Sequence, residues 1–403
     1  MQTVIRFSLC LLAFTIAAFA AHAEDPAPGA YKKVSCKKAP DKTYDLYVPK
    51  AYATEPDRKF PILFISTPNA RQTFYFLEKW ADRNGVLLVC INDSKNGPWP
   101  EIQKCQDAVI DSVEQTLRVH PCLRFAMGMS GAASASLGMA MRFPDKTAGV
   151  LMMCHDGAGQ VAAKHICMAF IYGGKDDTQP PAGIEAAIRA HQAKGCPVNK
   201  LLAPGRGHED AETSEIEPML DWMLGIARIS HPKLSPEEQK AAKDEIVRRM
   251  KACAEIKAPD ERIKEVQTLL DLPKVDTWPE SKPLPALWLS AQLEAAKSLA
   301  DPAAQCNVLM DALENSLTLK CSAAEQNAAK KELDDLCKQP ACKKEVEAHE
   351  TFKRAAQMET AAGKNKSKLA EAAQVYAGIA ARYPDTKAGR EASIAAKRMG
   401  EAK

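Results

Sequence analysis

The stretch over residues 123–133 constrains the fold of this chain more than any other. An apolar run short enough to form one buried strand ends at Gly128, and a segment rich in Ala, Ser and Met with helical spacing begins after Ser130. A strand that turns sharply into a helix strains the residue at the corner, and only small neighbours such as Gly128 and Gly131 allow this. The pattern predicts a serine hydroxyl that projects beyond the end of a strand, beside the first amide of a helix.

Apolar runs alternate with helical segments on both sides of this corner. Strands are predicted at residues 44–48, 61–66, 86–91, 123–128, 150–154, 167–172 and 201–203. Helices are predicted between them at residues 74–84, 101–119, 132–142, 183–194 and 213–224. This alternation predicts an α/β domain over residues 44–230 with a mostly parallel, doubly wound sheet. Its ligand site should lie beyond the carboxyl ends of the strands.

The segments that flank this domain have a different character. Residues 24–43 form an N-terminal lead whose Pro/Ala-rich first part we expect to be unstructured, which makes residues 44–48 an edge strand. Residues 235–403 are rich in Ala, Glu and Lys and are broken by prolines at intervals suited to helix ends. We therefore expect a separate, all-helical C-terminal region.

The end of this region contains part of a repeat pattern. The spacing of a second tetratricopeptide-type helix occurs at Ala372, Tyr376, Ile379 and Pro384. The preceding helix lacks the Leu-Gly pair of that repeat, and an array needs about three units. One tetratricopeptide-like hairpin and a plain helical bundle are both open interpretations, and either could bind a protein partner.

The first 23 residues have the three parts of a secretory signal. Arg6 supplies a positive charge, residues 7–20 are apolar, and residues 21–23 (Ala-His-Ala) form a small-x-small cleavage site. We expect a mature chain that begins near Glu24 and is secreted or periplasmic. An uncleaved membrane anchor is the alternative, and no later segment is long and apolar enough to span a bilayer.

The cysteine content fits an oxidising compartment. Of the 13 cysteines, Cys10 lies in the signal and an even number remains, which predicts disulfides. We favour a Cys167–Cys196 bridge, because each residue precedes a strand, and a Cys337–Cys342 bridge at a helix corner. Buried thiols are the alternative for cysteines that end apolar strands, such as Cys90 and Cys154.

Composition excludes several classes of function. The net charge of +3 on a chain that is 26% charged predicts no nucleic-acid binding, and a hydrophobic content of 46% excludes global disorder. No C-x-x-C pair has the spacing of zinc ligands, so we expect no metal site.

Two loops that follow predicted strands carry an acid and a histidine. Asp176 follows the strand over residues 167–172, and His208 follows the strand over residues 201–203. Both should lie at the edge of the sheet where Ser130 stands. Serine, then acid, then histidine is the chain order of a serine nucleophile on such a corner. His208 would take the hydroxyl proton and Asp176 would orient the imidazole, with Asp177 as the competing acid.

Two further side chains are candidates for the substrate pocket. His155 follows the strand over residues 150–154, and Trp99 lies between two prolines in the loop after residue 91. Packing against the next helix is the alternative for Trp99. The other histidines of this domain start strands or lie on helices, and we interpret them as structural.

Six segments carry a resemblance to a known family. They are residues 80–85 (WADRNG), 107–110 (DAVI), 128–132 (GMSGA), 142–145 (RFPD), 172–176 (YGGKD) and 205–208 (GRGH). Residues 44–227 thereby resemble the α/β-hydrolase superfamily, in particular exported esterases related to polyhydroxybutyrate depolymerases and to feruloyl or acetyl-xylan esterases. The resemblance implies cleavage of a small or polysaccharide-linked carboxylic ester through an acyl-enzyme on Ser130, without a cofactor. A peptidase of the prolyl-oligopeptidase type shares the triad order and is an alternative.

The chain departs from this family after its first central strand. The family carries a His-Gly pair there, and the amide of the next residue forms half of the oxyanion hole. This chain reads Ser-Thr-Pro-Asn-Ala over residues 66–70, and Pro68 has no amide to donate. The resemblance then implies a hole made by Gly131 and Asn69. Since the loss of one donor costs about a hundredfold to a thousandfold in rate, a weak or inactive hydrolase that acts as a binding protein is the alternative.

Overall fold

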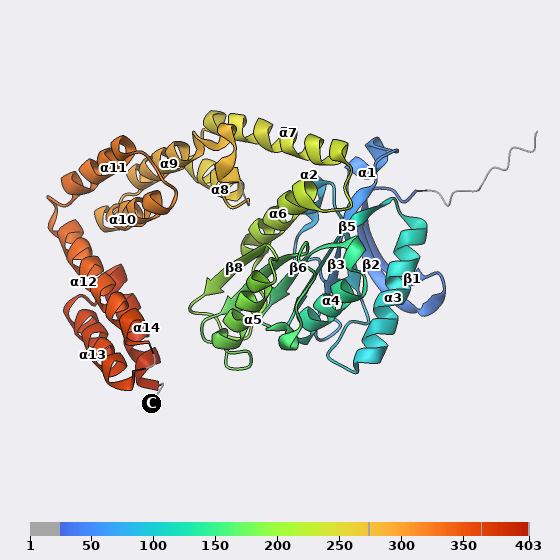
Figure 1. The fold of residues 1–403 in the computed structure, drawn as a ribbon, viewed down its shortest axis with the longest axis horizontal. Coiled ribbons are helices and arrows are strands. Elements are labelled where there is room, and N and C mark those ends of the chain that lie inside the picture. The colour runs from blue at the N-terminus through green and yellow to red at the C-terminus, as the bar shows by residue number, and fades with distance from the viewer. Residues whose placement is uncertain (1–24, 273–274, 364, 402–403) are drawn as a thin grey trace, which may run out of the picture. The chain divides into compact units, whose positions relative to one another are not determined.

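The computed structural model describes residues 25–272, 275–363 and 365–401 (Figure 1). The chain divides between Glu217 and Pro218 into two compact units, which we call the sheet unit and the helical unit. The predicted signal over residues 1–23 lies outside the described residues, and the domain limits inferred from composition stay a prediction. None of the helices in the described segments combines the length and apolar character needed to cross a bilayer.

The sheet unit is built on eight strands in the order β1-β2-β4-β3-β5-β6-β7-β8. β1 pairs antiparallel with β2, β2 pairs antiparallel with β4, and all other neighbours are parallel. The strands are β1 (Gly29–Cys36), β2 (Ala39–Val48), β3 (Phe60–Ser66), β4 (Leu87–Ile91), β5 (Val119–Met129), β6 (Thr147–Met153), β7 (Cys167–Gly173) and β8 (Val198–Ala203). This is the strand order of the α/β-hydrolase fold, so the predicted fold class is confirmed.

The central strands are continuously apolar because both faces of the sheet are covered. Every residue of β3, β6 and β7 is buried. Apolar side chains of three helices pack on one face, from α3 (Trp99–Thr116), α4 (Gly131–Arg142) and α5 (Pro181–Ala193). The short helices α1 (Ala51–Thr54) and α2 (Glu78–Asn84) complete the connections before β4. Burial of this kind is typical of parallel sheets and fixes the strand ends from which the site projects.

The prediction of an unstructured lead was wrong. β1 occupies residues 29–36, and β2 begins at Ala39, so β1 rather than β2 is the edge strand. Most residues of β1 are partly or fully exposed. Its strand conformation depends on backbone pairing with β2, which an apolar pattern does not reveal.

The helical unit begins at Pro218 within α6 (Thr213–Ser230), which spans the division of the chain. Its helices are α7 (Pro236–Ala252), α8 (Pro259–Leu270), α9 (Leu284–Ser298), α10 (Pro302–Thr318), α11 (Ala323–Leu336), α12 (Pro340–Ala362), α13 (Lys366–Arg382) and α14 (Lys387–Glu401). Tyr376 and Ile379 are buried in a cluster shared by α12, α13 and α14. The tetratricopeptide-like interpretation of this part stays a prediction.

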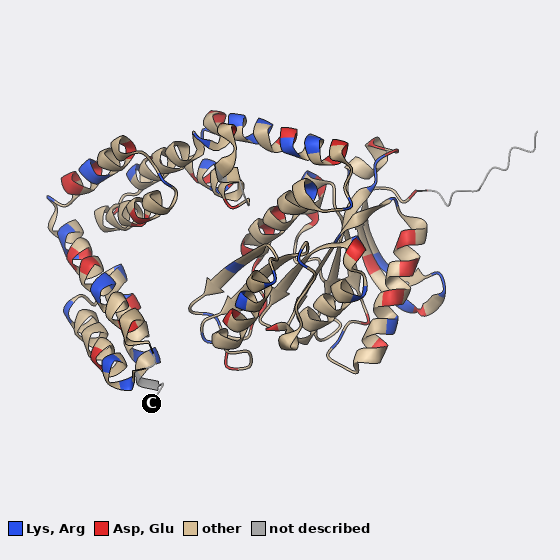
Figure 2. Cartoon of the chain, in the orientation of Figure 1, with Lys and Arg blue, Asp and Glu red and all other residues tan. Residues whose placement is uncertain are grey.

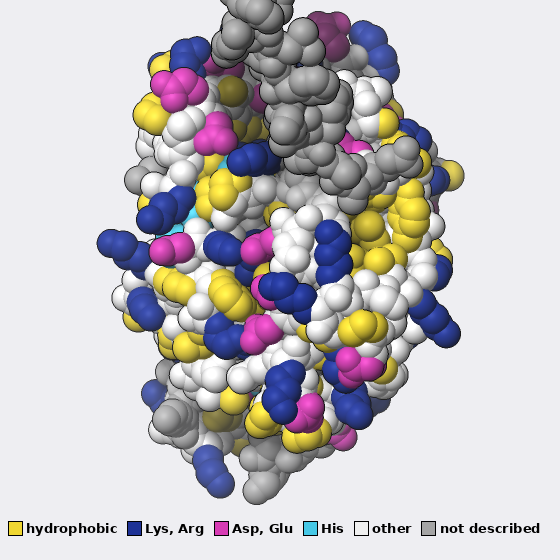
Figure 3. Space-filling model, turned by 90° about the vertical axis from the view of Figure 1, so that its right-hand side faces the viewer, with side chains coloured by type: hydrophobic (Ala, Val, Ile, Leu, Met, Phe, Trp, Pro, Cys, Tyr) yellow, Lys and Arg dark blue, Asp and Glu magenta, His cyan; other side chains and the backbone are white. Residues whose placement is uncertain are grey.

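Charged side chains of both signs are interspersed over the surface. Lys and Arg are mixed with Asp and Glu along the helices of the helical unit (Figure 2). The face drawn in Figure 3 likewise mixes charges of both signs with apolar side chains. The charges on the surfaces drawn are therefore mixed in sign rather than gathered into one large basic or acidic area.

Candidate active site

Ser130 occupies the corner between β5 and α4. Its backbone has a φ of 54° and a ψ of −133°, a left-handed conformation that costs free energy in any residue with a side chain. Gly128 lies so close to the start of α4 that a Cβ there would come within 2.4 Å of the Ala132 carbonyl oxygen. The sharp corner therefore requires glycine at position 128, and it exposes the serine hydroxyl beyond the sheet.

Ser130, His208 and Asp176 form a hydrogen-bonded line. The Nε2 atom of His208 lies 2.9 Å from Ser130 Oγ, and its Nδ1 atom lies 2.9 Å from Asp176 Oδ2. The Asp176 side chain is fully buried, and its second oxygen accepts a hydrogen bond of 2.7 Å from the Gln179 amide. Asp177 is exposed and has no contact with the imidazole. The geometry matches a serine nucleophile with its base and its orienting acid.

The loops that carry the acid and the histidine interlock through their backbones. A Cβ on Gly173 would come within 2.3 Å of the Arg206 carbonyl oxygen, and one on Gly174 within 2.8 Å of Pro204 Cα. The Lys175 amide donates a hydrogen bond of 2.8 Å to Arg206. The two glycines therefore allow the close approach that holds Asp176 and His208 together.

The loop after β3 lies beside the serine corner. Ser66 pairs with Gly128 across β3 and β5, which brings Pro68 and Asn69 next to Ser130. Asn69 forms an antiparallel bridge with Lys95, and beside it the Asn96 amide donates a hydrogen bond of 2.8 Å to the Pro68 carbonyl. The Asn69 side-chain oxygen accepts a hydrogen bond from the Arg71 amide at 3.3 Å. The Asn69 side-chain oxygen is thus engaged within its own loop, which leaves the backbone amide as the group of Asn69 that could serve an oxyanion.

Asn96 is a site residue that the sequence analysis missed. Its amide donates a hydrogen bond of 2.8 Å to the Pro68 carbonyl, and its side chain lies against Gly131, where a Cβ would come within 2.2 Å of Asn96 Oδ1. Among the described residues, the Asn96 side chain has no hydrogen-bond partner. Asn96 could have been predicted from its place in the loop after β4, because that loop lies at the same edge of the sheet as the triad.

The structure places the two predicted pocket residues, Trp99 and His155, in different surroundings. Trp99 is the first residue of α3 rather than part of a loop, because the prolines on either side of it suit the first turn of a helix; it is 45% exposed. The Nδ1 atom of His155 accepts a hydrogen bond of 2.8 Å from the Gly157 amide. Burial lowers the pKa of His155, Asp156 opposes this shift, and the nearby His208 adds to it. His155 is therefore neutral at pH 7 and lies close enough to His208 for the charge of one to affect the other.

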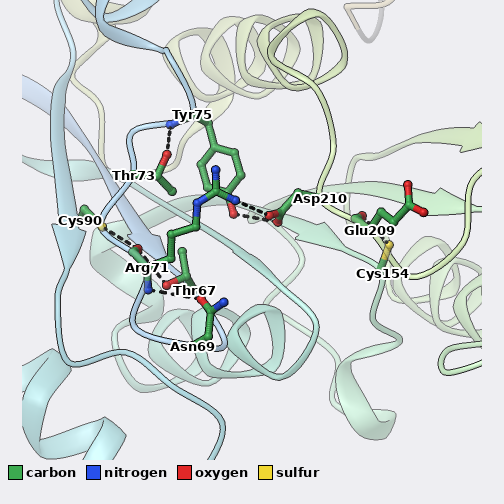
Figure 4. A network of polar contacts seen from close by, with 9 residues as sticks. All are labelled: Thr67, Asn69, Arg71, Thr73, Tyr75, Cys90, Cys154, Glu209 and Asp210. Atoms are coloured by element: carbon green, nitrogen blue, oxygen red, sulfur yellow. Dashed lines mark hydrogen bonds and ion pairs between the residues drawn. The ribbon is translucent and has the colours of Figure 1, made fainter.

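A polar network joins the loop after β3 to the loop that carries His208 (Figure 4). Asp210 accepts hydrogen bonds from Arg71 at 3.0 Å and from the Tyr75 hydroxyl at 2.9 Å. Thr67 donates a hydrogen bond of 3.0 Å to the Arg71 carbonyl. A cavity of about 220 Å³ lies against this network, lined by Arg71, Thr73, Tyr75, Phe76, Asp210, Ala211, Glu212 and Thr213. The network holds the two loops that flank the serine in fixed positions.

A buried thiol lies against the acid and the histidine. Cys154 follows β6, and its Sγ atom donates a hydrogen bond of 3.4 Å to the Glu209 carbonyl (Figure 4). Burial and the nearby Asp176 carboxylate raise the pKa of Cys154 to about 11. The thiol is therefore protonated at pH 7.

The predicted disulfides are not formed, because every cysteine in the described residues is a free thiol. The thiol of Cys196 donates to the carbonyls of Ala162 and Ala163 rather than bonding to Cys167. The thiol of Cys342 donates to the Pro302 carbonyl at 3.0 Å. Both bridges were inferred from position along the chain, which does not fix where a side chain points.

Comparisons with known proteins yield matches of structure only. No protein-family model matches the sequence, and no curated protein matches it. Similar solved structures include a thermostable esterase, with 15% identity, a TM-score of 0.35, and coverage of 43% of this chain and 54% of that one. An S-formylglutathione hydrolase from Agrobacterium tumefaciens has 13% identity, a TM-score of 0.36, and coverage of 45% and 89%. Est1E from Butyrivibrio proteoclasticus has 14% identity, a TM-score of 0.38, and coverage of 49% and 98%.

This chain thus spans about half the length of the thermostable esterase. At these identities and scores the assignment of the fold rests on the strand order of the sheet itself. What the site does has to be argued from its own geometry.

Proposed function

We propose that this chain is a serine hydrolase that cleaves carboxylic esters through an acyl-enzyme on Ser130. The observation that carries the proposal is the line from Ser130 through His208 to Asp176, with both hydrogen bonds at 2.9 Å. A serine hydroxyl is a poor nucleophile at neutral pH unless a neighbouring base accepts its proton. The buried Asp176 carboxylate accepts a hydrogen bond from Nδ1 of His208, which leaves Nε2 free to act as that base.

The reaction would proceed in two halves. Ser130 Oγ attacks the ester carbonyl while His208 takes its proton, and His208 then donates that proton to the leaving alcohol. Water, activated by the same imidazole, then releases the acid from Ser130. Asp176 stays ionised throughout and stabilises the imidazolium.

The oxyanion would be held by backbone amides on both sides of the nucleophile. Gly131 offers the first amide of α4, and Asn69 offers the amide of a residue in the loop after β3. We include the Asn96 side chain as a third donor. It lies against Gly131 and has no other partner among the described residues, and a turn of its amide group would exchange the nearer Oδ1 for the donor Nδ2. This set supplies a hydrogen-bond donor in place of the one that Pro68 lacks.

The substrate class and the setting of the protein are part of the proposal. An ester substrate rests on the sequence resemblance to exported esterases, and a peptide bond is the alternative substrate. Export rests on the secretory pattern of residues 1–23. N-terminal sequencing of the protein recovered from outside the cytoplasm should find a chain that begins near Glu24.

The test is labelling of the purified protein with a fluorophosphonate probe, which reacts with activated serines. We expect labelling of the unmodified chain and of Ser134→Ala, a control on the partly exposed part of α4. Ser130→Ala and His208→Ala should not be labelled. A folded protein that takes up no label would contradict the proposal and favour a binding role for the helical unit. Labelling that persists in Ser130→Ala would contradict the assignment of the nucleophile.

A further inference from the structure

Three different metal-binding side chains meet within the sheet unit. Cys154, Asp176 and His208 follow three consecutive strands, β6, β7 and β8, and their ligand atoms all lie within 4.8 Å of one another. A thiolate, a carboxylate and an imidazole are the three ligand types that zinc takes in proteins. The thiol has no part in the acyl transfer proposed above, so its presence at the triad calls for a separate explanation.

The thiol is held in this position by its surroundings. Cys154 has a φ of 50°, and its amide donates a hydrogen bond of 2.9 Å to the Ile171 carbonyl of β7. Its Sγ atom is directed to the carbonyl of Glu209, the residue next to His208. Cys154 is 2% exposed and the Asp176 side chain is fully buried, whereas the His208 side chain is 19% exposed. Solvent therefore reaches the group from the histidine side.

We propose that Zn²⁺ binds to Cys154 Sγ, the Asp176 carboxylate and His208 Nδ1, and thereby inhibits the hydrolase. The inhibition rests on the proposed function, whereas the binding of the metal does not. Zinc prefers four ligands, and a water molecule would supply the fourth. The charges of a thiolate and a carboxylate balance those of Zn²⁺, so the buried group carries no net charge when the metal is bound.

The proton balance explains the inhibition. The Cys154 thiol loses its proton to solvent as Sγ binds the metal. In the active form, the proton on His208 Nδ1 forms a hydrogen bond to Asp176. Zinc replaces that proton on Nδ1, and the neutral imidazole carries its proton on Nε2 instead. That nitrogen can then no longer accept the proton of Ser130. Zinc would hold the catalytic histidine in the wrong tautomer.

Inhibition of ester hydrolysis by ZnCl₂ tests the proposal in the full-length protein. With 4-nitrophenyl acetate as substrate and a buffer that binds no metal, we expect zinc to inhibit the unmodified chain and EDTA to reverse the inhibition. Cys154→Ala and the closer mimic Cys154→Ser should need at least about 10-fold more zinc for half inhibition. Each variant is compared with its own rate without metal. Cys196→Ala, which removes another buried thiol, should respond like the unmodified chain.

A spectroscopic titration tests the site without relying on activity. Co²⁺ bound to a thiolate absorbs in the near ultraviolet, and we expect one such site in the unmodified chain and in Ser130→Ala, but none in Cys154→Ala or Cys154→Ser. Equal zinc sensitivity of the Cys154 variants, or a cobalt signal that survives in them, would overturn the proposal. A cobalt signal that depends on Cys154 in a protein without esterase activity would refute the proposed function alone.

Discussion

The two units of this chain place their charged groups differently. In the sheet unit, the side chains of Asp176, Asp45 and Arg124 are 0–1% exposed and each has a charged or titratable partner. In the helical unit, ion pairs such as Lys297–Glu332 lie at the surface, with side chains 60% and 39% exposed. A buried charge is costly unless it is paired, whereas a surface pair contributes little. The sheet unit therefore holds paired charges that are fully buried, whereas the ion pairs of the helical unit keep more contact with solvent, even where one member is as buried as Arg262 at 10% exposure.

The largest effect should come from a histidine of the sheet unit and not from one of the helical unit. His208→Ala removes the base, and we expect kcat for ester hydrolysis to fall by roughly 10⁴-fold or more. His349→Ala removes a histidine of α12 that contacts Glu314, and kcat should stay unchanged. Steady-state kinetics on both variants make the comparison, and a comparable loss in His349→Ala would show that the helical unit takes part in turnover.

The second prediction sharpens the account of the oxyanion hole. Asn96→Ala should lower kcat by about 10-fold to 1000-fold with little change in KM, since the lost donor acts on the charge of the transition state. Lys95→Ala changes the neighbouring exposed side chain and should keep kcat. An unchanged kcat in Asn96→Ala would contradict the role of Asn96, and only the amides of Gly131 and Asn69 would then be candidate donors to the oxyanion.

The third prediction compares one ion pair from each unit by urea unfolding. Glu114→Gln leaves the buried guanidinium of Arg124 without its carboxylate, and we expect a loss of about 2 to 3 kcal/mol. Burial lowers the pKa of Arg124 and the charge of Glu114 opposes that shift. Glu332→Gln breaks an exposed pair in the helical unit and should cost less than about 1 kcal/mol. Equal losses would remove the distinction drawn between the units.

The fourth prediction concerns the effect of low pH on the free energy of unfolding of the sheet unit. Burial lowers the pKa of His191 below its ordinary value of 6.5. Its Nε2 accepts a hydrogen bond from the Ala162 amide, which a proton on that nitrogen would break. The unfolded chain therefore binds more protons below pH 6.5, and the free energy of unfolding of the sheet unit should fall as the pH drops below that value. Urea unfolding at pH 7 and pH 5 should show a smaller decrease for His191→Gln; an equal decrease would assign the effect to other groups.

Local patterns in the sequence predicted most strands and helices of the fold, but only some of the residues of the site. The serine corner could be predicted because the sharp turn requires Gly128, where a Cβ would meet the backbone of α4. The parallel strands could be predicted because they are apolar throughout. β1 was missed because pairing of backbones leaves no apolar pattern in an exposed strand. Asn96 and Cys154 were not tied to the site because their roles depend on contacts between separate loops, which no spacing along the chain encodes.

The interlocked loops around Gly173 and Gly174 have a consequence for how the protein works. The Asp176–His208 pair is assembled when the backbone folds and does not wait for a bound molecule to order it. Little conformational entropy is then lost at the acid and the base when substrate arrives, so the rate of turnover should depend on the chemical steps rather than on a closing motion of these loops. The acid and the base of the site are preorganised before substrate binds.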